Sequence, residues 1–418
     1  MSEYSVKKIG KLPLLFPEKH GGLARSFMWK VLGKLQVGSL TLREGDEAKV
    51  FGSISDSSAP HAEVHVHDTD LYRRILTGGS IAAGETFIEG MWSSPDLTEV
   101  TRAFSANMAM LEAMSDKQNW LARLALKLSH WARRNTSTRS RENISAHYDL
   151  GNDFFSLFLD PSMMYSSAVF PSASADLAAA SQHKLKLICE DLELKAEDHL
   201  VEIGTGWGGM AIFAAEHYGC RVTTTTISRQ QYDYTVEAVA QKGLENQVTV
   251  LFDDYRDLQG QFDKLVSIEM IEAVGHQFYD TYFQKISHLL KPHGKAVIQA
   301  ITITEQRYEQ ARDSVDFIKR YIFPGGCLPS LTVVSDALSR VTDMQMSNLR
   351  DIGRDYADTL KVWHASFLNK LDEVRAMGFD DRFIRMWRYY LSYCEGGFRE
   401  RIIGTHQITL TKPGYRPD

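Results

Sequence analysis

The chain has 418 residues and a formal net charge of −6 at pH 7. That length leaves room for two domains, and the acidic balance argues against a nucleic-acid-binding protein. The four cysteines show no paired spacing, and no run reaches the ~20 apolar residues of a membrane span. We therefore expect a cytoplasmic, reduced protein that is at most peripheral to a membrane.

Residues 1–115 predict a small accessory domain of mixed α+β type. Alternating runs at 38–43 and 62–67 are typical of strands, and helical patterns follow around 69–76 and over 97–114. His65 and His67 point to one face of the second run, as two metal ligands would. Because no cluster of further ligands matches them, we interpret both as solvated or hydrogen-bonded histidines and predict no metal site.

Residues 116–142 predict a basic amphipathic linker. Between 117 and 141 all charged side chains are basic, and a helical wheel places Trp120, Leu124, Leu128 and Trp131 on one face beside them. Such a helix suits the anionic surface of a membrane. The alternative is a linker helix that packs on a domain and turns its basic side to water.

From residue 143 to 418 the pattern is that of an α/β domain. Strand-like runs at 199–203, 221–226, 247–252, 263–268 and 295–303 alternate with helix-length stretches, which predicts a doubly wound, mostly parallel sheet. Ligands of such sheets bind at the carboxyl ends of the strands. We therefore expect Gly204, Thr226, Asp254 and the segment 269–272 to meet in one crevice.

A glycine turn follows the first of these strands. Gly204, Gly206 and Gly209 satisfy the G-x-G-x-x-G pattern, in which bare backbone approaches a nucleotide-like ligand. The pattern alone fits NAD and S-adenosylmethionine equally. A dinucleotide site needs an acidic residue about twenty positions later, whereas residues 221–228 contain no carboxylate. NAD is therefore disfavoured.

Eight separated blocks of sequence lie at 147–155, 164–170, 202–209, 226–231, 271–276, 321–330, 355–360 and 393–399. Together they resemble the cyclopropane fatty acid synthase family of S-adenosylmethionine-dependent methyltransferases. The resemblance implies a Rossmann-like class I methyltransferase domain behind a smaller mixed α+β domain. It also implies methylene transfer to the cis double bond of phospholipid acyl chains, peripheral contact with the inner face of the cell membrane, and a homodimer.

The resemblance also assigns residues that contact S-adenosylmethionine. For Thr226 and Gln231 the alternative is a strand end and a helix cap that satisfy local backbone groups. Tyr255 stands where the family often has an aromatic residue near the adenine, and an ordinary half-buried tyrosine is equally consistent with the sequence. The assigned residues are Tyr165, Ser166, Gly204, Gly206, Thr226, Ile227, Gln231 and Tyr255.

The catalytic base of the family is thought to be a bicarbonate ion held by cysteine, glutamate, histidine and tyrosine side chains. Glu272 matches the glutamate and Tyr356 matches the tyrosine, but Ser167 replaces the cysteine and Gln299 replaces the histidine. Serine and glutamine still donate hydrogen bonds, yet the positive charge available from histidine is gone. Bicarbonate is therefore in doubt, and direct action of Glu272 is the alternative.

Other outcomes remain open from the sequence. A cation that escapes ring closure gives a methyl- or methylene-branched fatty acid. The same scaffold suits another small acceptor, or a non-catalytic lipid-binding protein. Cys394 matches a cysteine once proposed as a nucleophile, but alkene attack on a sulfonium needs none, and we favour a shape-filling thiol. Residues 305–400 predict an acyl-binding insertion whose amphipathic stretch, 305–321, forms a lid or merely a connecting helix.

Overall fold

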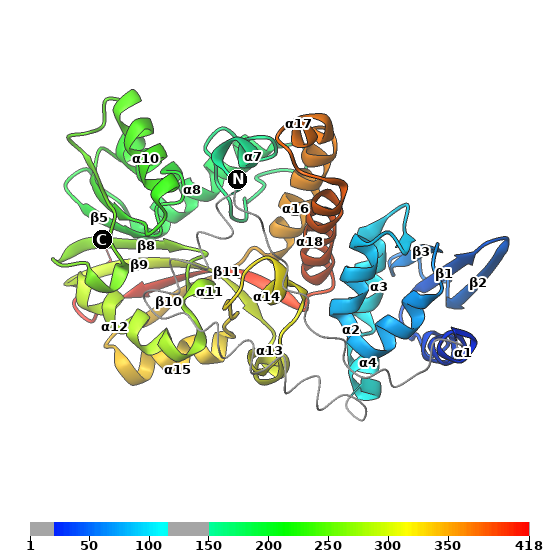
Figure 1. The fold of residues 1–418 in the computed structure, drawn as a ribbon. Coiled ribbons are helices and arrows are strands. Elements are labelled where there is room, and N and C mark those ends of the chain that lie inside the picture. The colour runs from blue at the N-terminus through cyan, green and yellow to red at the C-terminus, as the bar shows by residue number, and fades with distance from the viewer. Residues whose placement is uncertain (1–20, 116–149, 418) are drawn as a thin grey trace.

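The computed structural model describes residues 21–115 and 150–417, which form two packed units (Figure 1). The predicted basic segment 117–141 and the predicted boundary near residue 142 lie outside the described residues. The described part of the chain contains no helix that is long and apolar enough to cross a membrane.

The amino-terminal domain is a four-stranded sheet with helices on it, as the mixed α+β prediction expected. The strand order is β2-β1-β3-β4, and β1 runs parallel to β3 and antiparallel to β2. Its elements are α1 (Gly21–Leu32), β1 (Ser39–Glu44), β2 (Glu47–Gly52), β3 (His61–Val66), α2 (Asp70–Ile88), β4 (Trp92–Ser93), α3 (Leu97–Ala106) and α4 (Met108–Ser115).

One detail of this domain differs from the sequence prediction, and a second, the separate hydrogen bonding of His65 and His67, agrees with it. The expected helix over 97–114 breaks at Asn107, whose side-chain oxygen accepts hydrogen bonds from Gln36 N and Val37 N at 2.8 and 3.1 Å. The two histidines do not act together: His65 contacts Glu63 Oε1 at 2.6 Å, and His67 contacts Ser93 Oγ at 2.7 Å.

The second domain contains a seven-stranded sheet of order β10-β11-β9-β8-β5-β6-β7. The five predicted strands pair in parallel, and two strands that were not predicted, β10 and β11, extend one edge antiparallel. The strands are β5 (His199–Ile203), β6 (Arg221–Thr225), β7 (Val248–Leu251), β8 (Phe262–Ile268), β9 (Leu290–Ile303), β10 (Gln345–Asp351) and β11 (Ile403–Thr411).

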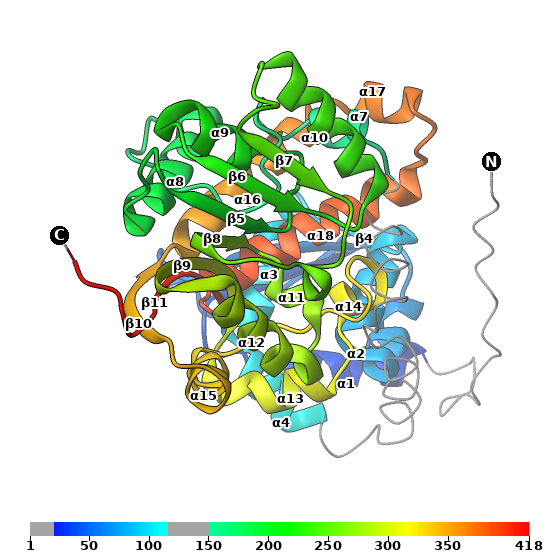
Figure 2. The same ribbon diagram turned by 90° about the vertical axis from the view of Figure 1, so that its left-hand side faces the viewer.

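Helices cover both faces of this sheet (Figure 2). One apolar layer joins it to α8 (Leu177–Leu192), α9 (Gly209–Tyr218) and α10 (Arg229–Gln241), and the other to α11 (Ile271–Val274), α12 (Tyr279–Leu289) and α15 (Leu331–Val341). Side chains fix several helix starts: Asp176 accepts from Ala179 N before α8, and Ser228 accepts from Gln231 N before α10. The doubly wound prediction is thereby confirmed.

Short helices and two long ones complete the domain. The predicted lid stretch folds as a 3₁₀ turn, Glu305–Arg307, followed by α13 (Tyr308–Asp313) and α14 (Phe317–Tyr321). The others are α7 (Asn152–Ser156), α16 (Gly353–Leu368), α17 (Leu371–Ala376) and α18 (Asp381–Arg399), together with 3₁₀ turns at Tyr255–Asp257 and His276–Phe278.

Helix α18 joins the two domains. Thr101 Oγ1 donates to Ser392 O at 2.7 Å, and Thr98 Oγ1 donates to Glu395 Oε2 at 3.1 Å. A Cβ added to Gly396 would meet Thr101, so α3 and α18 approach as closely as a glycine permits. The amino-terminal domain is thus packed directly on a helix of the second domain.

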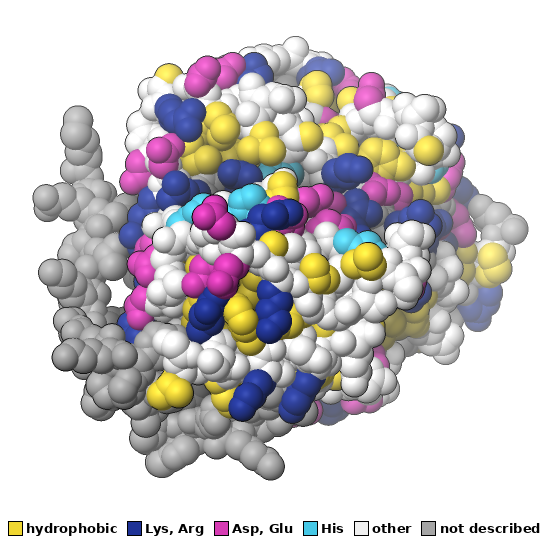
Figure 3. Space-filling view, turned by 90° about the vertical axis from the view of Figure 1, so that its right-hand side faces the viewer, with side chains coloured by type: hydrophobic (Ala, Val, Ile, Leu, Met, Phe, Trp, Pro, Cys, Tyr) yellow, Lys and Arg dark blue, Asp and Glu magenta, His cyan; other side chains and the backbone are white. Residues whose placement is uncertain are grey.

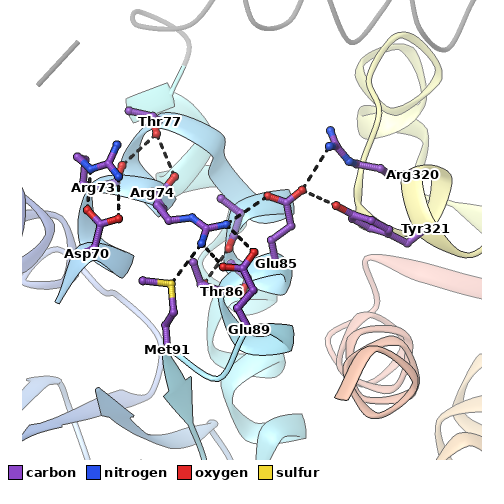
Figure 4. Close-up of polar contacts among 12 residues, drawn as sticks. Asp70, Arg73, Arg74, Thr77, Glu85, Thr86, Glu89, Met91, Arg320 and Tyr321 are labelled. Carbon is purple, nitrogen blue, oxygen red and sulfur yellow. Dashed lines mark hydrogen bonds and ion pairs between the residues drawn. The ribbon is translucent and has the colours of Figure 1, made fainter. Parts of the chain in front are cut away.

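A polar cluster adds a second connection, between α2 and α14 (Figure 4). Glu85 accepts a hydrogen bond from Tyr321 and lies 3.4 Å from Arg320 Nη2 and 3.9 Å from Arg74 Nη2. Beside it, a Cβ on Gly84 would approach Phe317 to 2.6 Å. The predicted lid segment is therefore held against the amino-terminal domain.

Candidate active site

One cavity of about 1380 Å³ lies at the carboxyl ends of β5, β6 and β8 and extends under α13 and α14 into the amino-terminal domain. Its lining includes Gly204, Thr226, Asp254, Glu269, Met270 and Glu272, as expected. Ile271, the remaining residue of the expected segment 269–272, is buried in the core and does not line the cavity. The volume exceeds the roughly 300–1,000 Å³ of a typical small-molecule pocket. The predicted crevice is thus present, and it has room for more than one small ligand.

The glycine turn brings bare backbone to the cavity. Gly204, Gly206 and Gly208 have φ of 97°, 53° and 87°, and helix α9 begins at Gly209 with its free amide groups at that end. A Cβ at Gly209 would lie 2.6 Å from Met164 Sδ, whereas one at Gly206 meets no atom within 4 Å. Gly209 therefore lets the 162–164 loop approach, and Gly206 keeps cavity space open.

All eight residues assigned to the cofactor line this cavity. The structure brings together Tyr165, Ser166, Gly204, Gly206, Thr226, Ile227, Gln231 and Tyr255. Thr226 Oγ1 also donates to Gln231 Oε1 at 2.9 Å and accepts from Ser228 N at 3.1 Å. The local capping role and a place in the cavity therefore coexist for Thr226 and Gln231.

Aromatic side chains form much of the wall near these residues. Tyr165 stacks on Trp363 with ring centroids 5.2 Å apart, and its hydroxyl lies 2.9 Å from that of Tyr390. Tyr255 meets Tyr282 edge to face, and burial raises the pKa of Tyr255 to about 12. The electron-rich faces of such rings stabilise a positive charge.

A carboxylate that sequence reasoning placed in the crevice, but not among the catalytic residues, lies at the centre of the predicted catalytic group. Glu269 Oε1 accepts from Ser167 N at 2.9 Å and from Gln299 Nε2 at 2.8 Å, and Oε2 accepts from Tyr356 Oη at 2.8 Å. Glu269 has a φ of 50° just after β8, a conformation uncommon for residues other than glycine. Ser167, Gln299 and Tyr356 therefore converge as expected, but around Glu269.

This geometry bears on the two bases considered from the sequence. The donors expected to hold bicarbonate already bind Glu269, and the Ser167 hydroxyl donates to Ala168 O at 2.8 Å instead of facing the group. The residues therefore do not fit a bound bicarbonate ion. The signal that could have found Glu269 is a second carboxylate three positions before Glu272, at the end of the same strand.

Glu272 has a different environment. One carboxyl oxygen accepts from Ile301 N, and the other, Oε2, is buried without a partner among the described residues. Burial, together with the nearby charge of Glu269, raises the pKa of Glu272 to about 8. Glu272 therefore carries a proton at neutral pH.

Burial raises the pKa of Glu269, but several neighbouring groups lower it. They are the hydrogen bonds from Gln299, Ser167 and Tyr356 and the charge of Lys184. Lys184 is fully buried, and its Nζ donates to Ser166 Oγ at 2.7 Å. Burial lowers the pKa of Lys184 to about 8, so most of the lysine stays charged at neutral pH. This cation favours an ionised Glu269.

Replacing Lys184 with methionine is expected to shift the acid limb of the pH–rate profile to higher pH. Without the buried cation the pKa of Glu269 rises, so a larger share of the carboxyl is protonated at a given pH. The profile of kcat against pH checks this. Lys186→Met is the matched control, because Lys186 is an exposed residue of the same helix. An unchanged acid limb in Lys184→Met would contradict the influence of Lys184 on the pKa of Glu269.

Cys394 lines the cavity, and burial raises the pKa of its thiol well above the usual value. A nucleophilic cysteine requires the opposite shift, toward the thiolate. The environment of Cys394 therefore agrees with the shape-filling interpretation.

Solved structures with this arrangement share the fold. A structure of the mycolic acid cyclopropane synthase CmaA1 complexed with SAH and CTAB is 30% identical, with a TM-score of 0.61, and covers 65% of this chain and 98% of that chain. The cyclopropane synthase MmaA2 from Mycobacterium tuberculosis gives 28% identity and the same TM-score and coverage. Fold, glycine turn and cavity define a class I methyltransferase that uses S-adenosylmethionine.

The particular family follows from sequence comparison. The family model described as mycolic acid cyclopropane synthetase matches residues 135–408, and the chain belongs to this family. The cyclopropane-fatty-acyl-phospholipid synthase of Escherichia coli (strain K12) is 38% identical over 86% of this chain and 90% of its own length. The tuberculostearic acid methyltransferase UfaA1 of Mycobacterium tuberculosis is 36% identical over 86% and 85%. The family resemblance carried by the eight blocks is thereby confirmed, and so is the prediction that the protein is a methyltransferase.

Proposed function

We propose that the protein transfers a methylene unit from S-adenosylmethionine to the cis double bond of an unsaturated phospholipid acyl chain and forms a cyclopropane fatty acid. The observation that carries this proposal is the Glu269 carboxylate, which faces a long, largely apolar cavity and is held by Ser167, Gln299 and Tyr356. A base fixed beside an apolar chamber suits proton removal from a hydrocarbon.

The cofactor supplies an electrophilic methyl group, and the residues of the chain provide the remaining requirements. Gly204, Gly206, Thr226 and Gln231 would hold it on the glycine-turn side of the cavity. When the alkene takes up the methyl group, a positive charge develops on the neighbouring chain carbon. The rings of Tyr165 and Tyr390 and the charge of Glu269 stabilise that cation.

Glu269 then acts as the base. One carboxylate oxygen accepts a proton from the new methyl group, the C–H electron pair closes the ring, and the cation is neutralised. Tyr356, Gln299 and the Ser167 amide keep the carboxylate in place during this step. Because Glu272 carries a proton at neutral pH, it is the weaker candidate for the base.

A second product has specific support. If a hydride shifts from the methylated carbon to the cationic carbon before the ring closes, loss of a proton from the methyl group gives a methylene branch. Loss of a proton from a chain carbon gives a methyl-branched alkene. UfaA1, named a tuberculostearic acid methyltransferase, resembles this chain about as closely as the Escherichia coli synthase does.

Lipid mass spectrometry after labelling with trideuteromethyl S-adenosylmethionine tests both products. The experiment uses purified protein and vesicles of a monounsaturated phospholipid. Loss of one deuterium with loss of the alkene supports the cyclopropane. Loss of one deuterium with a retained alkene means a methylene branch, and retention of all the deuterium means that the proton left a chain carbon. No mass gain on any unsaturated lipid overturns the proposal.

Replacing Glu272 with glutamine is expected to leave most of the activity intact at pH 7, because a neutral amide resembles the protonated carboxyl. The pKa of Glu272 is raised from its usual 4.5 to about 8. Its contribution to the free energy of unfolding is therefore fully present below about pH 4.5 and lost as the pH rises through about 8. Urea unfolding should show a smaller loss of stability between pH 5 and pH 9 in the variant. Equal losses would contradict the shifted pKa.

The way in which the enzyme reaches its lipid is part of the same proposal. We place it on the cytoplasmic side of the membrane, as a peripheral protein and a homodimer, with residues 117–141 on the bilayer. On the face shown in Figure 3, acidic and basic side chains are intermixed with hydrophobic ones. Vesicle sedimentation with and without anionic lipid tests this contact, and equal binding would contradict an electrostatic role for 117–141.

A further inference from the structure

The cavity extends well beyond the catalytic group, into the interior of the amino-terminal domain. Strands β1 and β3 line it with Leu40, Leu42 and Val64, and the helices add residues such as Ile75 of α2, Phe104 of α3 and Met108 of α4. A small domain ordinarily fills the space between its sheet and its helices with side chains. Here part of that space is continuous with the active site.

The lining changes in character from one part of the cavity to another. No charged side chain of the described amino-terminal domain lines it. Around α13 and α14, by contrast, the lining includes Glu309, Asp313 and Lys319. An amphiphile placed in this cavity would leave water most favourably with its hydrocarbon end in the amino-terminal domain and its polar end near α13 and α14.

A break in helix α2 lies on this route. Gly79 has φ 60° and ψ −144° inside the helix, and Gly79 lines the cavity. Before the break α2 presents Ile75 to the cavity, and after it Gly84 packs against Phe317 of α14. One helix therefore lines the apolar interior and also contacts the segment that carries the charged lining.

We propose that the interior of the amino-terminal domain is the binding chamber for the methyl-terminal part of the reacting acyl chain. This inference rests on the proposed function, since it takes the double bond to lie beside Glu269. The chamber then limits how many carbons can follow the double bond. The amino-terminal domain is thereby a determinant of substrate specificity.

Photo-crosslinking to vesicle lipids tests the location directly. One phospholipid carries a diazirine at the terminal carbon of its monounsaturated chain, a second carries it on the saturated chain, and a third carries it in the headgroup. Irradiation with the wild-type protein and peptide mass spectrometry should give adducts from the first probe in 21–115. Adducts from that probe only in 150–417, or adducts in 21–115 only from the other two probes, would overturn the proposal.

Variants that fill the chamber give a second test. Ile75→Trp is expected to lower kcat/KM at least about tenfold for a long tail beyond the double bond and to spare a short tail. Affinity for S-adenosylmethionine should not change. Val50→Trp is the matched control, because Val50 is 56% exposed on β2 and does not line the cavity.

If Ile75→Trp lowers kcat/KM equally for long and short tails, the proposed role of the chamber is overturned. Failure of the proposed function is a separate result: the wild-type protein would then give no methylated lipid at all, while crosslinking would still report whether a chain enters the domain.

Discussion

Replacing Glu269 with glutamine is expected to lower kcat by about 10²- to 10⁴-fold, the usual contribution of a positioned general base. Glutamine keeps the size of the side chain and retains an oxygen that can accept from Tyr356 or Gln299. It has no basic oxygen, so the proton on the methylated chain has no acceptor. Methyl transfer into phospholipid, measured with labelled S-adenosylmethionine, checks the loss.

The fold and the cofactor site should survive this change. Calorimetric binding of S-adenosylmethionine and the thermal midpoint serve as readouts that do not depend on turnover. Glu272→Gln is the matched control, since it replaces a carboxyl three residues away in the same cavity. If Glu269→Gln keeps more than about a tenth of the wild-type rate, or if Glu272→Gln loses as much as Glu269→Gln, the base is not Glu269.

Replacing Gly206 with valine is expected to weaken S-adenosylmethionine binding by about 10- to 100-fold, the cost of forcing extra atoms into an occupied space. The added Cβ would meet no protein atom within 4 Å, because it projects into the cavity. The protein therefore tolerates the side chain more easily than the bound cofactor does. Isothermal calorimetry gives the dissociation constant.

Backbone strain must be separated from this steric effect. Gly206 has φ 53°, a conformation that valine adopts reluctantly. Gly243 has φ 67° and also meets nothing within 4 Å, but it does not line the cavity. Gly243→Val therefore reproduces the strain without filling the site. Comparable losses of cofactor affinity in the two variants would show that strain, not occupancy, is responsible.

The sequence was sufficient for the five parallel strands and for placing the proposed cofactor residues in one cavity. Apolar runs alternate with helix-length stretches, and the carboxyl ends of neighbouring parallel strands necessarily meet, so Gly204 and Thr226 could be placed together before any coordinates. The edge strands β10 and β11 escaped prediction. Strand β10 is largely exposed and has no continuous apolar run, so its pattern carries little signal.

The catalytic group shows where sequence reasoning ends. Two carboxylates lie three positions apart after β8, and their order in the chain does not say which one faces the donors. In the structure, Glu269 has a φ of 50° and accepts hydrogen bonds from Tyr356 and Gln299, so Glu269 is the carboxylate that faces the donors. Likewise, the sequence placed Ser167 in the group for its hydroxyl, whereas its backbone amide makes the contact.

The interior of the amino-terminal domain could not be anticipated either. Leu40, Leu42 and Val64 follow the alternation of any half-buried strand. That pattern is the same whether the apolar side chains fill a core or surround a cavity, because it reports only that they avoid water. Only the positions of the facing helices distinguish the two cases.

The arrangement of the domains around α18 has a consequence for how such enzymes diversify. The family model covers 135–408 and leaves the amino-terminal domain outside, yet this domain packs on α18 and lines the same cavity as Glu269. If the amino-terminal domain holds the acyl chain as proposed, the chemistry and the recognition of the chain reside in different domains of one protein. Mutations in residues 21–115 would then alter which lipids are modified while the residues that perform the reaction stay unchanged.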